Sequence, residues 1–497
     1  MVDLLTIPIF LLAPVVAILW YLYEKVKCPK ALQDIPAVPL WKSTWASIMS
    51  MDSSERFDKF VVPVITKKGV ARHYLFGKWT VIVANPDYAK TILMNKGDVF
   101  PKIIMSREQP NTLRAKLTSV NIVSSNGDEW RKHRRVANPA FHRTWTTSTF
   151  GELMSRLISE IDRTSTNVPV KEMMQRMTLD ALGKAIFDYD FNSIENQGGE
   201  IVKLYNTIMT GLGNPLYAMF PFLENAPLLG RRGYHTELEK FNQFIMDIIN
   251  SKVEKVREGK AVDAQSADLV TLMIQAGEAE NEKLTPKEIR NDVIIFFIAG
   301  HDTTANALSS AIYYLSIHPE YQQKAREEVI SVLSNEEKDI YPTFEQQQNS
   351  LPFITAIMKE SMRLNPSAAQ VVSRRTTEPV QFGEFVLPAG TATSVQIYAM
   401  HHNPNIWENP YRFMPERFLD EKVNQDLFSW MPFGGGGRRC IGMNFSLIEQ
   451  RVVLSMLLRK FSWTLPTNSI HFDRLKTMPA SGLMETRDLT MNFKALY

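Results

Sequence analysis

The sequence predicts a mainly α-helical protein with small β-sheets (an α+β fold), preceded by one amino-terminal membrane helix. From Phe150 to about Leu333, apolar residues recur at the 3.6-residue spacing of helices, and long loops are few. Residues 73–84 predict two strands around Gly77-Lys78, because Val81-Ile82-Val83 is a run of β-branched side chains. Residues 4–23 carry no charge and are dominated by apolar side chains.

The composition is that of an ordinary globular chain. Its 497 residues are 44% hydrophobic and 22% charged, which excludes a disordered protein and supplies enough apolar material for a core. A formal net charge of +3 is too small to indicate nucleic acid as a partner. The two cysteines, Cys28 and Cys440, exclude a disulfide framework.

We interpret the uncharged amino-terminal run as a retained signal anchor at residues 1–23. About 20 apolar residues suffice to span a bilayer, and three lysines follow between residues 25 and 30, which places the bulk of the chain in the cytoplasm. A cleaved signal peptide is the alternative, but a basic n-region and a small-residue cleavage site are missing. Residues 24–42 then form a basic, proline-containing hinge, and residues 43–497 form the main domain.

Further elements follow from turn and capping residues. A helix is expected from Asn85-Pro86-Asp87 toward Met94, and another from about Met443 to Lys460. The turn-rich residues 96–128 are expected to be irregular, and residues 385–390 read as a strand that ends in a tight turn. The apolar stretch 216–229, which two prolines interrupt, is either a buried loop or a surface that dips into a membrane.

The clearest chemistry lies in the glycine-rich loop from Phe433 to Gly442, which carries one thiol, Cys440. Its four consecutive glycines permit positive φ angles and a close approach of the backbone to a flat ligand. Arg438 and Arg439 favour the thiolate, which is the metal-binding form, and the following helix would point backbone N–H groups at the sulfur. A lone cysteine is usually an inert buried thiol, and a phosphate-binding loop would need the absent GxxxxGK[ST] spacing.

A second polar site interrupts an apolar helix within residues 291–304. Asp302 and Thr303 place a carboxylate beside a hydroxyl, as a proton relay requires. Burying these groups unused would cost free energy. A helix N-cap is the alternative for Asp-Thr-Thr, but the upstream apolar run indicates a position within the helix. His301 and the adjacent His401-His402 pair are expected to be structural, because neighbouring residues cannot face one metal site.

These motifs resemble those of the cytochromes P450. The spacing Phe-x-x-Gly-x-Arg-x-Cys-x-Gly at residues 433–442 is similar to the haem-ligand loop of that family, and Ala-Gly-x-Asp-Thr-Thr at 299–304 is similar to its oxygen-activation motif. Glu-x-x-Arg-Leu-x-Pro at 360–366 is a third match, and the resemblance extends over residues 35 to about 490. It implies the cytochrome P450 fold and a b-type haem whose iron takes Cys440 as its axial ligand.

The resemblance also gives roles to residues that are ambiguous alone. Trp130 and Arg134 share a helix face that could simply be solvated, but Trp-x-x-x-Arg matches the family's contact with a haem propionate. Arg374 corresponds to another propionate partner, with Arg375 left open by one extra residue. The cofactor-binding residues that the resemblance implies are Trp130, Arg134, Arg374, Phe433, Arg438 and Cys440.

Two more groups follow from the resemblance. Glu360 and Arg363 lie at i, i+3 and alone would form a surface pair of little energetic value. Together with Arg417 they would form a buried structural network in the family's fold. Residues 368–372 and 479–483 should line the substrate cavity.

The implied reaction is insertion of one atom of O₂ into a lipophilic small molecule (a steroid, terpenoid, fatty acid or xenobiotic), with Asp302 and Thr303 as the catalytic residues. GxGxxG is absent, so no bound flavin or nicotinamide is expected. Electrons would come from an NADPH–cytochrome P450 reductase, with cytochrome b5 as a further donor, at the cytoplasmic side of the endoplasmic reticulum membrane. A P450-like isomerase or dehydratase and a membrane-tethered haem sensor are the alternatives.

Overall fold

The protein is mainly helical with small sheets. The computed structural model describes residues 16, 20, 23–24, 26–49, 51–75, 77–94, 99–142, 145–196, 199–214, 217, 223–224, 231–258, 267–279, 283–420, 427–480 and 483–497. The α-helices in this part of the chain are α2 (Leu40–Ile48), α3 (Ser53–Phe60), α4 (Val62–Ile65), α5 (Pro86–Met94), α6 (Met105–Glu108), α7 (Leu113–Thr118), α8 (Gly127–His142), α9 (Thr147–Thr164), α10 (Val170–Leu182), α11 (Glu200–Gly213), α13 (Arg232–Arg257), α14 (Leu269–Ala279), α15 (Pro286–Ile317), α16 (Pro319–Leu333), α17 (Phe344–Asn349), α18 (Pro352–Leu364), α19 (Ile397–His401) and α20 (Met443–Lys460).

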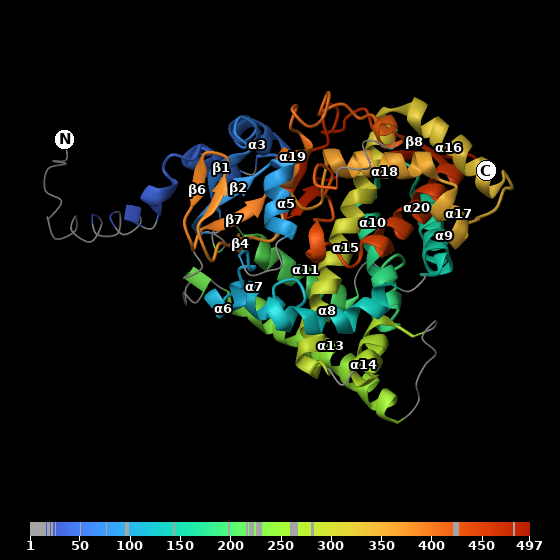
Figure 1. Cartoon of the computed structure of the whole chain (residues 1–497). Coiled ribbons are helices and arrows are strands. Elements are labelled where there is room, and N and C mark those ends of the chain that lie inside the picture. Colours follow the sequence, from blue (N-terminus) through green and yellow to red (C-terminus); the bar gives the residue numbers. More distant parts are fainter. Residues whose placement is uncertain are drawn as a thin grey trace, which may run out of the picture.

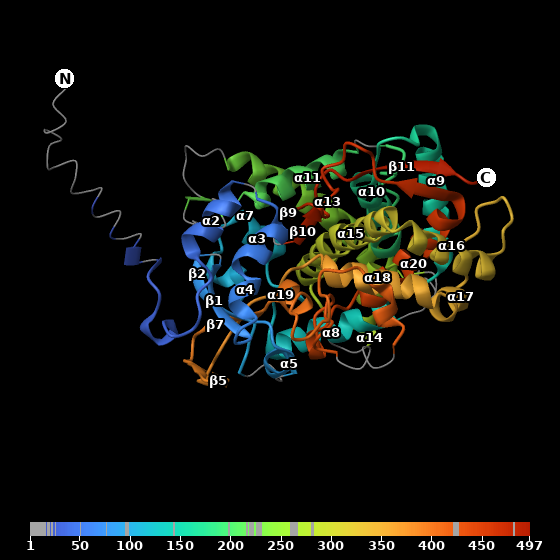
Figure 2. The ribbon, with the colours of Figure 1, turned by 90° about the horizontal axis from the view of Figure 1, so that it is seen from above.

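The largest sheet has four strands in the order β1-β2-β7-β4. Its strands are β1 (Val70–Leu75), β2 (Lys78–Val83), β7 (Ala392–Val395) and β4 (Arg374–Arg375). The β1–β2 hairpin is antiparallel and β2–β7 is parallel, so the strand predicted at residues 73–84 pairs with a segment about 300 residues later. This sheet lies at one end of the molecule and the carboxyl terminus at the other, with α15 between them (Figures 1 and 2).

The smaller sheets connect distant segments. Three strands, β3 (Val168–Pro169), β11 (Thr490–Ala495) and β8 (Phe461–Thr464), form one sheet near the carboxyl terminus. The remaining two are hairpins, one of β5 (Val380–Phe382) with β6 (Phe385–Leu387), and one of β9 (Thr477–Ala480) with β10 (Leu483–Thr486). The strand predicted at residues 385–390 corresponds to β6.

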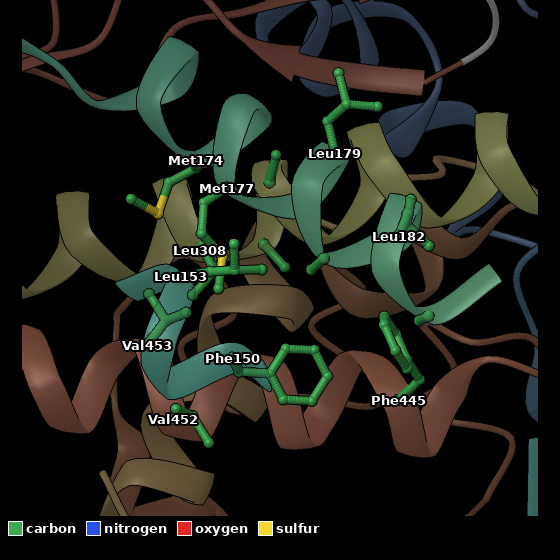
Figure 3. Close-up of a cluster of buried hydrophobic side chains, with 14 of the residues drawn as sticks. Phe150, Leu153, Met174, Met177, Leu179, Leu182, Leu308, Phe445, Val452 and Val453 are labelled. Atoms are coloured by element: carbon green, nitrogen blue, oxygen red, sulfur yellow. The ribbon is translucent and has the colours of Figure 1, made fainter. Parts of the chain in front are cut away.

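The helical core is built around α15 and α20. Both helices are buried on almost every side, and such helices are apolar around most of their circumference because they lie inside a large core. Figure 3 shows this packing, with Phe150 from α9, Met177 from α10, Leu308 from α15 and Val452 from α20 in one cluster. The capping box of Thr285 and Glu288 begins α15, so Asp302 and Thr303 lie within the helix, as predicted.

The structure corrects one prediction and leaves two outside the described residues. Residues 96–128 are not wholly irregular, since α6 and α7 form there, and the Thr112 hydroxyl caps α7 by accepting a hydrogen bond from the Ala115 N–H. Most of the proposed anchor (residues 1–23) and most of the apolar stretch 216–229 lie outside the described residues. In the part that is described, no helix combines the length and apolar character needed to cross a membrane.

The proline-containing segment after the anchor packs on the sheet. Ile35 and Val38 are buried, and the Val38 N–H donates to the Arg72 carbonyl of β1. The Arg72 N–H in turn donates to the Pro36 carbonyl at 2.8 Å. Residues 35–38 are therefore placed as an extension of the main domain.

Candidate active site

An inner cavity of about 330 Å³ lies between α15 and the glycine-rich loop. Its walls are mostly apolar, as is usual for small-molecule sites. The predicted residues that line it are Trp130, Arg134, Thr303, Ala368, Gln370, Val371, Val372, Arg374, Phe433, Arg438 and Cys440. Residues far apart in the sequence, from α8 to α20, are thus brought to one cavity.

The glycine-rich loop is held tightly against α5. The Cys440 N–H donates to the Phe433 carbonyl at 3.0 Å and closes the loop. Gly436 has φ +67°, and a Cβ at this position would lie 2.3 Å from the Leu93 carbonyl oxygen. Both observations require glycine at residue 436, because the backbone of α5 cannot yield as a flexible side chain would. The loop therefore presents the Cys440 thiol to the cavity in a fixed position.

Opposing effects act on the Cys440 thiol. Burial raises its pKa above the usual value, whereas the Gly442 N–H and the charges of Arg134 and Arg439 lower it. The predicted helix dipole is present, because α20 begins at Met443. The predicted effect of Arg439 on the Cys440 pKa is confirmed, whereas the second arginine that lowers this pKa is Arg134 and not Arg438.

Five cationic residues line the cavity, namely Arg439 and a cluster of four others that affect one another's pKa. Lys102, Arg134, Arg374 and Arg438 all line it, and the Arg438 guanidinium lies 4.3 Å from the centre of the Trp130 ring. Burial lowers the pKa of Arg438 to about 9 and that of Arg374 to about 10, and burial together with the three arginines lowers the pKa of Lys102. Such mutual repulsion is costly unless an anion offsets it.

Backbone carbonyls, not carboxylates, hold this cluster. Arg438 donates to the Ser125 carbonyl at 2.6 Å, Lys102 to Val123 at 2.7 Å and Arg374 to Phe100 at 3.0 Å. Among the described residues none of the four cations has an ion pair, and the buried Arg374 Nε has no partner. The cluster therefore fits a planar ligand with an acidic edge, such as a haem with its propionates.

The structure distinguishes Arg374 from Arg375 and adds Lys102. Arg375 is 41% exposed and pairs with Glu108 at 2.7 Å, so it is turned away from the cavity that Arg374 lines. Lys102 was missed, because a single lysine in a turn-rich segment gives no signal in the sequence. Its proximity to three arginines arises only when that segment folds over the cavity.

Thr303 and Asp302 point in different directions. Thr303 lines the cavity, and its hydroxyl donates to the Ala299 carbonyl at 2.5 Å. Asp302 does not line it. Its buried carboxylate accepts hydrogen bonds from Gln175 of α10 at 2.9 Å and from the Tyr205 hydroxyl of α11 at 3.0 Å. We predicted that both residues lie on the oxygen side of the ligand, and this is wrong for Asp302. Successive residues of a helix are about 100° apart, so the two side chains face different neighbours.

Comparison with known proteins identifies the family. The Cytochrome P450 family profile matches residues 36–490. The chain belongs to the cytochrome P450 family. It is 30% identical over 410 residues to the 11-oxo-beta-amyrin 30-oxidase of Glycyrrhiza uralensis, covering 79% of this chain and 75% of that protein. It is 28% identical over 404 residues to the human ultra-long-chain fatty acid omega-hydroxylase, covering 77% and 73%.

A solved structure shows the same fold. The crystal structure of the cytochrome P450DA heme domain superposes with a TM-score of 0.79, at 22% identity, over 93% of this chain and 98% of that one. The chain is thus a cytochrome P450 monooxygenase, a family whose cofactor is a thiolate-bound haem and whose members generally need a redox partner. The isomerase and sensor alternatives are set aside.

The three residues predicted to form a structural network, Glu360, Arg363 and Arg417, lie together in this P450. Glu360 accepts from Arg363 Nε at 2.7 Å and Nη2 at 2.9 Å, and from Arg417 Nε at 3.1 Å. The side chains of Glu360 and Arg363 are completely buried, and that of Arg417 is 10% exposed. The Met414 N–H donates to the same carboxylate, so Glu360 accepts four hydrogen bonds in all.

His401 links this network to Met431, which directly precedes the glycine-rich loop of the P450. The Arg363 guanidinium donates to the His401 carbonyl at 2.7 Å, while His401 Nδ1 lies 3.1 Å from the Arg363 carbonyl and Nε2 accepts from the Met431 N–H at 3.0 Å. These bonds fix the neutral tautomer with the proton on Nδ1. Burial and then Arg363 lower the pKa of His401 well below its usual value. His402 binds the Tyr398 carbonyl instead, so the two adjacent histidines serve separate contacts.

Proposed function

We propose that the inner cavity binds a b-type haem with the Cys440 thiolate as the axial ligand of its iron. One observation carries this proposal: a thiol and a cluster of four cations without carboxylate partners among the described residues line the same mostly apolar cavity. In this proposal Arg134, Arg374 and Arg438 bind the propionates, with Lys102 beside them. The Trp130 ring supports the Arg438 guanidinium through a cation–π contact, and Phe433, which lines the same cavity, packs beside the haem ring.

When bound, the haem supplies the activation of O₂ for insertion of one oxygen atom into the substrate. The chain's own residues supply protons and exclude water. The Thr303 hydroxyl lies on the cavity wall and can donate a hydrogen bond into it after leaving the Ala299 carbonyl. Asp302 lies one residue away, outside the cavity, where its carboxylate accepts hydrogen bonds from Gln175 and Tyr205.

The substrate that this cavity favours is a lipophilic small molecule. Apolar residues from α8, α10 and α15 form much of its surface, so the bound molecule is removed from water. The similar proteins act, by their names, on 11-oxo-beta-amyrin and on ultra-long-chain fatty acids. A terpenoid or fatty-acid substrate is therefore the first choice within the broader group that includes steroids and xenobiotics.

Electrons are proposed to come from an NADPH–cytochrome P450 reductase, with cytochrome b5 as a second donor. We place the protein in the endoplasmic reticulum membrane, anchored by residues 1–23 and joined by the segment 24–42 to the catalytic domain at 43–497. The uncharged amino-terminal run and the lysines that follow it support this arrangement.

The test is reconstitution of the full-length protein with reductase and NADPH under ¹⁸O₂. Candidate fatty acids, terpenoids, steroids and xenobiotics are offered separately, and the products are analysed by mass spectrometry. The proposal predicts at least one product that carries a single ¹⁸O atom and forms only when NADPH is present. Products whose added oxygen comes from water, or products formed equally without NADPH, would contradict it.

A further inference from the structure

A second, outer cavity of about 340 Å³ adjoins the inner one. The segment of Ala368 and residues 370–372 contributes to the walls of both, while Cys440 lines only the inner cavity. Apolar side chains such as Leu75, Ile103 and Met105 form much of the outer wall. The two cavities therefore share one wall segment, and a molecule longer than the inner cavity can extend along it.

Most charges around the outer cavity are already paired. Glu224 accepts from Arg231 Nε at 3.1 Å and from Arg231 Nη2 at 3.2 Å. Glu108 binds both Lys78 and, at 2.7 Å, Arg375. Glu224 and Arg231 neutralise each other, and both Lys78 and Arg375 have the Glu108 carboxylate as a partner.

Arg114 is the exception. It is the second residue of α7 and lines the outer cavity, and within the described part of the chain its guanidinium has no ion pair and no hydrogen bond. Burial is the only effect that lowers the pKa of Arg114, since no carboxylate opposes it. Arg114 is half-buried, and partial removal of a guanidinium from water without an anion costs free energy. An anion supplied from outside the chain would offset that cost.

We propose that Arg114 binds the carboxylate of a lipophilic acid whose apolar body extends along the shared segment toward Cys440. The planar guanidinium matches a carboxylate with two parallel hydrogen bonds, and the surrounding apolar wall strengthens that pairing. This proposal rests on the proposed function, because it assigns a substrate class to the same site. It places the acid group at the end of the substrate farther from the reacting atoms.

The inner cations do not explain Arg114. Lys102, Arg134, Arg374 and Arg438 line the inner cavity, whereas Arg114 lines only the outer one. Arg114 is therefore not positioned to hold a haem bound in the inner cavity. Haem content and the reduced carbon monoxide spectrum serve as readouts that the proposal leaves unchanged in Arg114 variants.

The experiment measures binding to the full-length haem protein by equilibrium dialysis with labelled dodecanoate and dodecanol. Arg114→Gln removes the charge, and Arg114→Lys keeps it. Lys116→Gln is the matched control, since Lys116 is an exposed cation of the same helix that lines neither cavity. A triterpenoid acid and its alcohol form a second pair, which distinguishes a ring-like from a chain-like apolar body.

The proposal predicts that Arg114→Gln weakens binding of an acid by roughly 10–100-fold, as expected for loss of a hydrogen bond to a charged group. Binding of the corresponding alcohol should weaken by less than about twofold, because the alcohol has no carboxylate for Arg114 to bind. Arg114→Lys should retain part of the preference, and Lys116→Gln all of it. Equal binding of both acids and their alcohols by the unaltered protein, or unchanged acid binding in Arg114→Gln, would overturn it. Absence of the haem-thiolate spectrum in the unaltered protein would instead contradict the proposed function. The two failures are distinguishable, because equilibrium dialysis measures acid binding independently of that spectrum.

Discussion

The buried network around Glu360 gives the most quantitative prediction. The substitution Glu360→Gln preserves the size of the side chain but removes the negative charge that Arg363 and Arg417 share. It also replaces a carboxylate oxygen with an N–H group, which faces donors instead of an acceptor. Arg363 would then remain fully buried without an anion, because its other contacts are to the backbone carbonyls of His401, Pro410 and Arg412.

The magnitude follows from burial. Breaking a buried ion pair by removing one partner costs about 3–5 kcal/mol, since the desolvated charge that remains has no compensation. At ~2.1 cal/mol/K per residue, a chain of 497 residues unfolds with an entropy of about 1 kcal/mol/K. The midpoint of thermal unfolding should therefore fall by about 3–5 °C if the chain unfolds as a unit. Because the same network holds His401, haem retention should fall in the same temperature range.

The assay is thermal unfolding of the purified haem protein, followed by circular dichroism and by haem absorbance. Glu237→Gln is the control, since its pair with Lys240 at 2.9 Å lies at the surface, where such a pair is worth about 0–1 kcal/mol. A Glu360→Gln midpoint within 1 °C of the control, on this ~1 kcal/mol/K scale, would refute the assignment of Glu360 as the shared anion of a buried network.

Three other predictions concern the oxygen side and the pH dependence of stability. Thr303→Ala should slow product formation by roughly 10–100-fold and raise hydrogen peroxide release, because a proton donor on the cavity wall is lost; an unchanged product yield per NADPH would contradict this. Tyr205→Phe removes one of two hydrogen bonds to Asp302, so the yield of product per NADPH should fall while haem binding is unaffected, and equal yields would sink the idea. Burial lowers the pKa of His402 to about 3 and that of His401 well below its usual value, so the unfolded chain binds more protons below pH 6.5. The free energy of unfolding should consequently decrease from pH 6.5 toward pH 3 by up to about 1.4 kcal/mol per pH unit for each histidine. Urea titration at several pH values measures this dependence. The free energy of unfolding should change less steeply with pH in His401→Gln, and an unchanged slope would contradict the buried, neutral state of His401.

Much of the fold could be predicted where a local pattern determines it. The helix expected from Met443 to Lys460 has those bounds in α20, because apolar residues surround it and Gly442 precedes it. The two strands around Gly77-Lys78 were also predicted, since a β-branched run follows a tight turn. By contrast, α6 and α7 were missed within turn-rich residues, because each is shorter than two turns and gains its stability from tertiary contacts.

The site could be predicted only as far as motifs extend. The glycine-rich loop identified Cys440 because its spacing is specific. Trp130 and Arg134 followed from the match to the family's Trp-x-x-x-Arg, since their shared helix face alone could be a solvated one. Lys102 and Arg114 were not found, because the meaning of each depends on which charges lie nearby after folding. The orientation of Asp302 was equally hidden, since it is determined by Gln175 and Tyr205 on two other helices.

The central claim is that the Cys440 thiolate is the axial ligand of a haem bound in the inner cavity. The most direct measurement is the absorbance difference spectrum of the reduced carbon monoxide complex, recorded for the unaltered protein and for Cys440→Ser at matched haem content. The claim predicts the thiolate signature in the unaltered protein and its loss in the variant, because a serine hydroxyl cannot replace thiolate as a donor. Retention of the thiolate signature in Cys440→Ser would contradict it.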